Sequence, residues 1–222
     1  MKVEDVEIEF LGHSGFLLAN GKRVVIDPYK VSDKLGKADL ILISHSHYDH
    51  CSIEDIEKLA EDGTVVVCTA DAQSKIMKIK GIDLQVVEIG DKLDLDDIRI
   101  EAVPAYNIRK DYHPKEEGWI GFVIKMGNNV FYHTGDSDFI PEMYKLTGYG
   151  KHENKFVAFL PVSGKYVMTA EQAAEAASVL SPDLAVPMHY GAGVAGILKD
   201  AEKFRELCKE KNVKVEIMEK LE

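Results

Sequence analysis

Six consecutive residues, His45-Ser46-His47-Tyr48-Asp49-His50, place three imidazoles and one carboxylate directly after the apolar run Leu40 to Ile43. Neutral imidazole is the commonest nitrogen ligand of zinc-like ions, and a carboxylate adds a negatively charged oxygen. His45 and His47 are two residues apart, so in an extended segment both rings point to one side. Asp49 and His50 follow where the chain turns, and they can serve a second ion. The segment predicts a binuclear metal site with ions about 3.5–4 Å apart.

Further donors are expected where later strands end. Asp136 follows the apolar run Val130 to Tyr132 in a glycine turn, where a carboxylate can bridge two ions or simply stabilise the turn. His189 ends the run Leu184 to Met188. A lone histidine at such a position is more often structural. Asp136 and His189 are therefore metal-ligand candidates only in combination with residues 45–50.

The elements that must position these residues alternate between strands and helices. Hairpin turns are expected at Asn20-Gly21 and around Gly127-Asn128, and helices after the capping signals Ser52 with Asp55 and Thr169 with Gln172. Other expected elements are an acidic turn over 91–97, a polar loop over 104–118, an amphipathic helix over 197–210 and a final strand over 213–218. The order predicts an α/β protein, α+β in its layering, with two sheets packed face to face between helical layers.

The whole chain fits one domain over 1–222, because no linker or low-complexity segment interrupts its 222 residues. No apolar run approaches the roughly 20 residues that cross a bilayer, and residues 1–5 show no leader, so the cytoplasm is the expected compartment and no membrane contact is expected. The net charge of −11 argues against a general nucleic-acid binder. Three cysteines without a CxxC pair are expected to be reduced. Cys51 beside His50 is a less favoured metal ligand, and His152 is expected at the surface.

The ligand run, together with Thr134-Gly135-Asp136 and Met188-His189-Tyr190-Gly191, resembles the metallo-β-lactamase superfamily over nearly the whole chain. The segments at 11–16, 26–28 and 161–169 resemble its stand-alone metal-dependent hydrolase branch, which includes ascorbate-6-phosphate lactonase-like proteins. The resemblance implies a four-layer αββα sandwich of the metallo-β-lactamase type, with a hydrolase site in which two divalent ions activate water. Zinc is the expected metal, with manganese, iron and nickel as alternatives.

Carried over residue by residue, the resemblance assigns His45 and His47 to the first ion and Asp49, His50 and His189 to the second, with Asp136 as the bridge. The family has one more histidine after the strand near residue 100, where this chain reads Pro104-Ala105-Tyr106-Asn107. His113 is the preferred substitute, with Asn107 or water as the alternative. Asp49 and His50 are also expected to orient the water, and are the catalytic candidates.

The expected substrate is a small anionic ester, lactone or phosphodiester. Lys165, Arg109 and His13 are the substrate-binding candidates, because cations can hold a phosphate or carboxylate and His13 lies in a glycine turn. The alternative for Lys165 and Arg109 is that they are ordinary solvent-exposed charges without a role in substrate binding. Other hypotheses are a metallo-ribonuclease or phosphodiesterase on nucleic acid, a diiron oxidoreductase of the same fold, and a metal-bearing binding module. The diiron relatives carry an acidic residue where this chain has His47. A homo-oligomer is compatible with the sequence.

Overall fold

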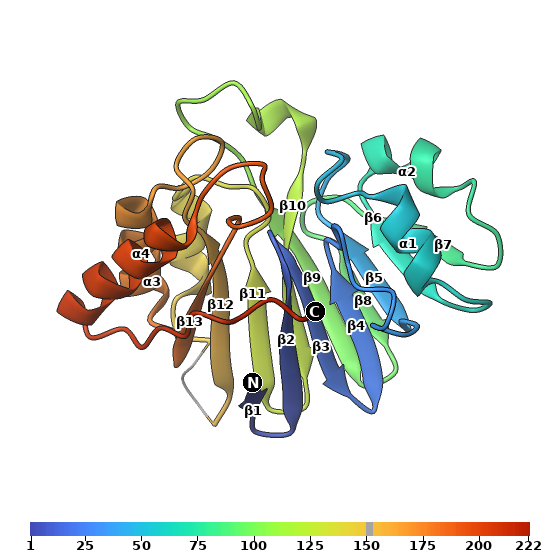
Figure 1. The fold of residues 1–222 in the computed structure, drawn as a ribbon, viewed down its shortest axis with the longest axis horizontal. Coiled ribbons are helices and arrows are strands. Elements are labelled where there is room, and N and C mark those ends of the chain that lie inside the picture. The colour runs from blue at the N-terminus through green and yellow to red at the C-terminus, as the bar shows by residue number, and fades with distance from the viewer. Residues whose placement is uncertain (150–152) are drawn as a thin grey trace. The chain divides into compact units, whose positions relative to one another are not determined.

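The computed structural model describes residues 1–149 and 153–222, and the chain divides into two compact units (Figure 1). Unit 1 comprises residues 1–88 and 219–222, and unit 2 comprises residues 89–218. Each unit contains a mixed β-sheet and helices, which confirms the α/β class. The single domain over 1–222 stays a prediction, and His152 lies outside the described residues. Among the described residues, no helix is long and apolar enough to cross a lipid bilayer.

The sheet of unit 1 has its strands in chain order. They are β1 (Lys2–Val3), β2 (Val6–Gly12), β3 (Gly15–Asn20), β4 (Lys22–Ile26), β5 (Leu40–Ile43), β6 (Val65–Cys68) and β7 (Asp83–Val86). Strands β1 to β4 are antiparallel neighbours, and β4 to β7 run parallel. The predicted turn at Asn20-Gly21 joins β3 to β4, with Gly21 at a φ of +68°.

Helix α1 (Ile53–Leu59) connects β5 to β6, and helix α2 (Ala70–Ile76) connects β6 to β7. The predicted N-cap of α1 is confirmed, since the Ser52 side chain accepts a hydrogen bond from the backbone N–H of Asp55. Both helices bury apolar residues in one core with the strands; its members include Leu17, Val25, Ile41, Ile43, Ile56, Leu59, Val66 and Ile76. The C-terminal residues also belong here, because Leu221 N donates to Phe10 O at 2.8 Å.

The sheet of unit 2 repeats the change from antiparallel to parallel pairing. Its strands are β8 (Lys92–Leu95), β9 (Ile98–Pro104), β10 (Ile120–Met126), β11 (Asn129–His133), β12 (Lys155–Pro161) and β13 (Leu184–Met188). Strands β8 to β11 are antiparallel, and β11, β12 and β13 are parallel. The predicted hairpin around Gly127-Asn128 joins β10 to β11.

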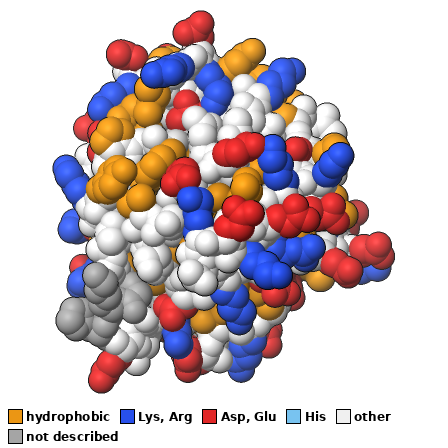
Figure 2. Space-filling view, turned by 90° about the vertical axis from the view of Figure 1, so that its left-hand side faces the viewer, with side chains coloured by type: hydrophobic (Ala, Val, Ile, Leu, Met, Phe, Trp, Pro, Cys, Tyr) orange, Lys and Arg blue, Asp and Glu red, His pale blue; other side chains and the backbone are white. Residues whose placement is uncertain are grey.

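The helices of unit 2 are η1 (Lys115–Glu117), η2 (Pro141–Leu146), α3 (Ala170–Leu180) and α4 (Leu198–Glu210). The predicted capping box of α3 is confirmed: Gln172 N donates to Thr169 Oγ1 at 3.2 Å, and Thr169 N donates to Gln172 Oε1 at 3.0 Å. Helix α3 packs against α4 and β12 and buries its alanine-rich face. Acidic and basic side chains are interspersed on the face that carries these two helices (Figure 2).

Two predicted elements are wrong. Residues 213–218 form no strand; they touch β13 through the single bridge Ala185–Val215, because the residues that follow, 219–222, pair in unit 1 instead. The segment 91–97 is more than an acidic turn: Lys92–Leu95 is strand β8, paired with β9. Asp96, with a φ of +55°, forms the tight turn between these two strands.

The two sheets share a layout that matters for function. In unit 1 the parallel strands β4 and β5 lead directly into Asp27 and Ser44, and in unit 2 the strands β11, β12 and β13 lead into the segments that carry Asp136, Ser163 and His189. Parallel strands end at the same edge of a sheet, which is where α/β proteins commonly bind ligands. Each unit therefore gathers its polar segments at one sheet edge.

Candidate metal centre

In unit 1, the buried carboxylate of Asp27 organises two of the predicted ligands. Asp27 Oδ1 accepts from Ser44 N at 2.8 Å, and Oδ2 accepts from Ser44 Oγ at 2.6 Å and from His50 Nδ1 at 2.8 Å. Because the Ser44 hydroxyl proton is directed to Asp27, its oxygen accepts from His45 Nδ1, 2.9 Å away. Both imidazoles thus have Nδ1 as the donor, and Nε2 carries the lone pair that a metal needs.

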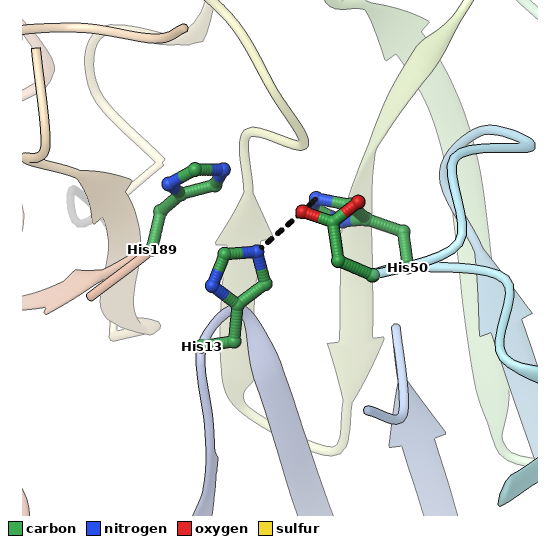
Figure 3. A group of neighbouring side chains, drawn as sticks. His13, His50 and His189 are labelled. Carbon is green, nitrogen blue, oxygen red and sulfur yellow. Dashed lines mark hydrogen bonds and ion pairs between the residues drawn. The ribbon is translucent and has the colours of Figure 1, made fainter. Parts of the chain in front are cut away.

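Asp49 and His47 complete the cluster of unit 1. His13 Nε2 donates to Asp49 Oδ2 at 2.9 Å, as drawn in Figure 3. One ligand atom from each of His13, Asp49 and His50 lies within 4.8 Å of the others. His47 Nδ1 is 3.1 Å from His45 Nε2. The structure therefore brings the four predicted ligands of the first segment together and adds His13 as a buried partner of Asp49.

Backbone hydrogen bonds hold this loop in shape. His50 N and Cys51 N both donate to His47 O, at 3.0 and 2.7 Å, and Lys75 Nζ from α2 donates to Ser46 O at 2.5 Å. Cys51 is buried, and burial raises the pKa of its thiol to about 11. A thiol must lose its proton to bind a metal, so this shift disfavours Cys51 as a ligand.

In unit 2, two predicted ligands, His113 and His189, contact the same carboxylate oxygen of a third, Asp136. His113 Nε2 lies 3.2 Å and His189 Nε2 lies 3.1 Å from Oδ2 of Asp136. All three side chains are at most 4% exposed. His189, which is labelled in Figure 3, follows β13, and His113 lies in the polar loop after β9. Residues far apart in the sequence thus form one His–Asp–His cluster within this unit.

The outer nitrogens of these two histidines are also held. His113 Nδ1 lies 3.1 Å from the carbonyl oxygen of Tyr166 and 3.2 Å from Asn107 Oδ1, and both of these atoms are acceptors. Nδ1 therefore carries the proton, and Nε2 faces the carboxylate with its lone pair unless a proton or a cation lies between them. His189 Nδ1 is 2.9 Å from Ser163 Oγ. Asn107 thus supports His113, whose ring reaches Asp136.

Close backbone packing sets the position of Asp136. A Cβ on Gly121 would lie 2.5 Å from His133 O, and a Cβ on Gly135 would lie 2.5 Å from Ile120 O. Gly135 also has a φ of +60°, and its N–H donates to His133 Nδ1 at 3.2 Å. Glycine at both positions lets the turn after β11 lie against the start of β10 and direct Asp136 to its partners.

The loop that carries His113 is held by an ion pair between the partly exposed side chain of Lys110 and the buried carboxylate of Asp138. Lys110 Nζ contacts Asp138 Oδ1 and donates to Val167 O at 2.7 Å, while Asp138 Oδ2 accepts from Ile108 N at 2.9 Å. Lys110 is thereby committed to positioning the loop. The substrate candidates Arg109 and Lys165 are exposed. His13 is buried against Asp49, and substrate contact by these three residues stays a prediction.

Backbone strain also collects at these clusters. His13, Asp27 and His189 have φ values of +56°, +42° and +62°, a region that residues with a Cβ rarely adopt. Such conformations cost about 1–3 kcal/mol each and persist where the surrounding structure enforces them, often at functional sites. Among the described residues, three of the nine non-glycine residues with a positive φ thus hold or orient candidate ligands.

The donor sets fit divalent metal ions. Both clusters combine imidazole nitrogens with carboxylate oxygens. In four of the histidines, His45, His50, His113 and His189, the outer nitrogen is hydrogen-bonded, which is the usual environment of metal-binding histidine. Sequence reasoning gave no role to Asp27, Ser44, Ser163 or the carbonyl of Tyr166. Two signals were available. The segments 26–28 and 161–169, which contain Asp27, Ser163 and Tyr166, resemble the hydrolase branch. Asp27 and Ser44 also follow directly after a strand, and Ser163 follows shortly after β12.

Comparisons with known proteins place this chain in a family. A family model of the β-lactamase superfamily domain matches residues 7–189. A UPF0173 metal-dependent hydrolase of Thermoplasma acidophilum is 33% identical over 218 residues, which cover 93% of this chain and 92% of that relative.

Solved structures show the same fold. A structure from Parabacteroides distasonis, assigned to the metal-dependent hydrolases, has a TM-score of 0.82 and 30% identity, and the match covers 97% of this chain and 94% of that one. CmlA, a diiron β-hydroxylase from Streptomyces venezuelae, has a TM-score of 0.74 at 17% identity, over 99% of this chain and 54% of its own, and shares the fold alone. The metallo-β-lactamase fold is confirmed. The family model and the similar full-length relative together show that this chain belongs to the metallo-β-lactamase superfamily, among its metal-dependent hydrolases.

Proposed function

We propose that this metal-dependent hydrolase binds two divalent ions, most favourably zinc, and cleaves an ester, lactone or phosphodiester bond in a small anionic substrate. The observation that carries the proposal is the orientation of the histidines. In His45, His50 and His113 the Nδ1 atom is the donor, so Nε2 is the nitrogen available to a metal. A hydrogen-bonded outer nitrogen is the usual arrangement of metal-binding histidine, and it recurs in all three residues.

The proposed ligand sets follow the family resemblance. His45, His47 and His113 would hold one ion, Asp49, His50 and His189 the other, and Asp136 would bridge them. That the clusters of the two units serve one centre is part of the proposal. When bound, such ions would lower the pKa of water to about 7 and would offset the negative charge that develops during hydrolysis.

The chain's own residues have three tasks in this proposal. Asp27, Ser44, Ser163 and the Tyr166 carbonyl keep the histidine rings in position through their outer nitrogens. Asp49 and His50 orient the attacking water, and burial keeps bulk solvent from the ligands. Lys165 and Arg109 would attract the anionic group of the substrate, and His13 would act through Asp49 or touch the substrate directly.

Surface charge and cysteine chemistry support the proposed partners and compartment. The interspersed charges of Figure 2 offer no basic face over α3 and α4, in keeping with a small-molecule substrate in place of nucleic acid. Cys51, Cys68 and Cys208 are free thiols, which suits a reducing compartment such as the cytoplasm. Neither a membrane nor a nucleic acid is a proposed partner.

Metal analysis of the purified protein tests the centre. We expect two ions per chain by plasma mass spectrometry and no redox-active iron in a reductive titration. One ion or none would contradict the dinuclear centre, and two iron atoms that cycle between oxidation states would favour the diiron oxidoreductase.

A substrate panel tests the reaction. Metal-replete protein should hydrolyse bis-p-nitrophenyl phosphate or members of a lactone and ester series. Asp136→Asn should lose about 100-fold or more of this activity, because two histidine nitrogens would then share a neutral amide. Asp94→Asn, at an exposed carboxylate of the same unit, should match the parent protein. Two bound ions without turnover on the whole panel would favour a binding module.

A further inference from the structure

Beside the ligand cluster of unit 2 lies a pair of tyrosine rings. Tyr112 immediately precedes His113, and its side chain is 50% exposed. Its ring centroid is 4.7 Å from that of Tyr166, and the two ring planes meet at 85°. The backbone carbonyl of Tyr166 is the acceptor for His113 Nδ1, so the inner ring of the pair belongs to the residue that orients a candidate ligand.

A cation accompanies this pair. Lys165 Nζ lies 4.7 Å from the centroid of the Tyr166 ring. Lys165 is exposed and follows Ser163, the partner of His189, by two residues. An ammonium group over the face of an aromatic ring is held by the quadrupole of that ring while its other side remains available to an anion.

Unit 1 has the same combination beside its own ligands. Tyr48 lies between His47 and Asp49 in the sequence and is 64% exposed. Its ring centroid is 5.8 Å from that of Tyr29 at 75°, and Lys30 Nζ is 4.9 Å from the Tyr29 centroid. Tyr29 also contacts the ring of His13 edge to face. In both units an inner tyrosine contacts a ligand or its support, an outer tyrosine is exposed, and a lysine lies over the inner ring.

Exposed tyrosine is common on protein surfaces, but the same arrangement of two tyrosines and a lysine occurs beside both ligand clusters. This repetition suggests a shared role in binding. An edge-to-face pair presents flat, polarisable surface on which a planar ring can stack or pack by its edge. The neighbouring ammonium adds a charge preference for an acidic group. Each tyrosine pair with its lysine can therefore recognise a ligand that carries both a planar ring and an anionic group.

We propose that the substrate carries a planar aromatic ring close to its acidic group, and that the tyrosine pairs Tyr112–Tyr166 and Tyr29–Tyr48 select for that ring. The proposal rests on the proposed hydrolase function and narrows its substrate class from small anions to aryl or other flat-ring anions. In each unit the lysine over the inner ring, Lys165 in unit 2 and Lys30 in unit 1, is the candidate partner for the acidic group.

Binding of two phosphonates to the metal-replete protein tests the proposal. At pH 9 phenylphosphonate and cyclohexylphosphonate are both dianions, so contributions from metal and lysine are closely matched and the ratio of their Kd values reports on the flat ring. We expect phenylphosphonate to bind about 3- to 10-fold more tightly by titration calorimetry, in line with measured aromatic pairs. Equal affinity, or tighter binding of the puckered ring, would overturn the proposal.

Variants assign the preference to the tyrosines. Tyr112→Leu and Tyr48→Leu keep an apolar side chain but remove the flat ring, so at least one should bring the ratio near 1 with the metal content unchanged. Tyr144→Leu, at a tyrosine of η2 that is 60% exposed, is the matched control and should keep the parent ratio. A ratio that survives in both site variants would also overturn the proposal.

Failure of the proposed hydrolase function and failure of the aromatic substrate class give different experimental results. A protein that binds no metal contradicts the proposed function itself. A protein that holds two ions and hydrolyses the panel, but binds neither phosphonate or does not distinguish them, contradicts only the aromatic substrate class.

Discussion

Asp27 shows how one buried carboxylate can control several ligands. Its two oxygens accept three hydrogen bonds, from Ser44 N, Ser44 Oγ and His50 Nδ1. Since a carboxylate can only accept, the protons on Ser44 and His50 are forced into one direction, and His45 follows through the serine hydroxyl. Asp27 thus decides which nitrogen of two candidate ligands, His45 and His50, keeps its lone pair.

Asp27→Asn tests this arrangement at the residue scale. The amide offers one acceptor and one NH₂ group, so at least one of the three donors would face another donor. We expect metal affinity to fall about 10- to 100-fold, as for other residues that orient metal ligands. Titration against a chelator of known affinity measures the change.

Asp33→Asn is the control for this substitution, because Asp33 is an exposed carboxylate of the same unit. Its metal affinity should equal that of the parent. Parent-like affinity in Asp27→Asn, with circular dichroism showing an intact fold, would show that the histidines hold their orientation without this carboxylate.

At the scale of elements, the parallel strands and their crossovers bring the ligands together. Strands β11, β12 and β13 are neighbours, so the residues that follow them meet at one edge although long segments separate them in the chain. The backbones of β10 and of the turn after β11 must also lie close together, because the turn that carries Asp136 packs against Gly121. There is no room at Gly121 for any side chain.

Gly121→Ala should therefore destabilise this part of unit 2. The added methyl would lie 2.5 Å from the carbonyl oxygen of His133, a backbone atom that cannot rotate away. We expect a loss of about 1–3 kcal/mol in the free energy of unfolding, measured by urea denaturation. Lys125→Ala, at an exposed position of the same strand, should change stability by less than about 0.5 kcal/mol. Equal effects of the two substitutions would contradict the packing described for the turn.

At the scale of the whole molecule, metal binding and folding are linked. Imidazoles and carboxylates that converge in a buried cluster have no such arrangement in the unfolded chain, so a bound ion stabilises the native state. At a free concentration about 100 times its Kd, each ion adds about 2.7 kcal/mol.

Chelation should accordingly lower the melting temperature. Proteins of 150–250 residues shift by about 2–4 °C per kcal/mol, so removal of one such ion should cost about 5–10 °C, and calorimetry with and without a chelator measures it. Asp136→Ala should show a smaller difference, because its centre is already weakened. An unchanged melting temperature in the parent protein would contradict tight metal binding.

The amino-acid sequence alone determined much of this protein. Alternating apolar residues, Asn20-Gly21, and the caps at Ser52 and Thr169 predicted most strands, two hairpins and the helix starts, because these signals act within a few residues. The ligand run at 45–50 and the donors after later strands predicted a binuclear metal site, and their resemblance to the metallo-β-lactamase superfamily implied a hydrolase. The strand expected over 213–218 failed because pairing depends on which neighbour is available.

Only the tertiary structure decided how the donors are used. It showed His113 reaching Asp136 beside His189, Asn107 supporting His113, and Asp27 directing His50 and, through Ser44, His45. These relations join segments from different strands, and the direction of each hydrogen bond depends on partners distant in sequence. Local signals carry no information on which strand ends will be neighbours, so the choice of the ligating nitrogen appears only once the sheets have formed.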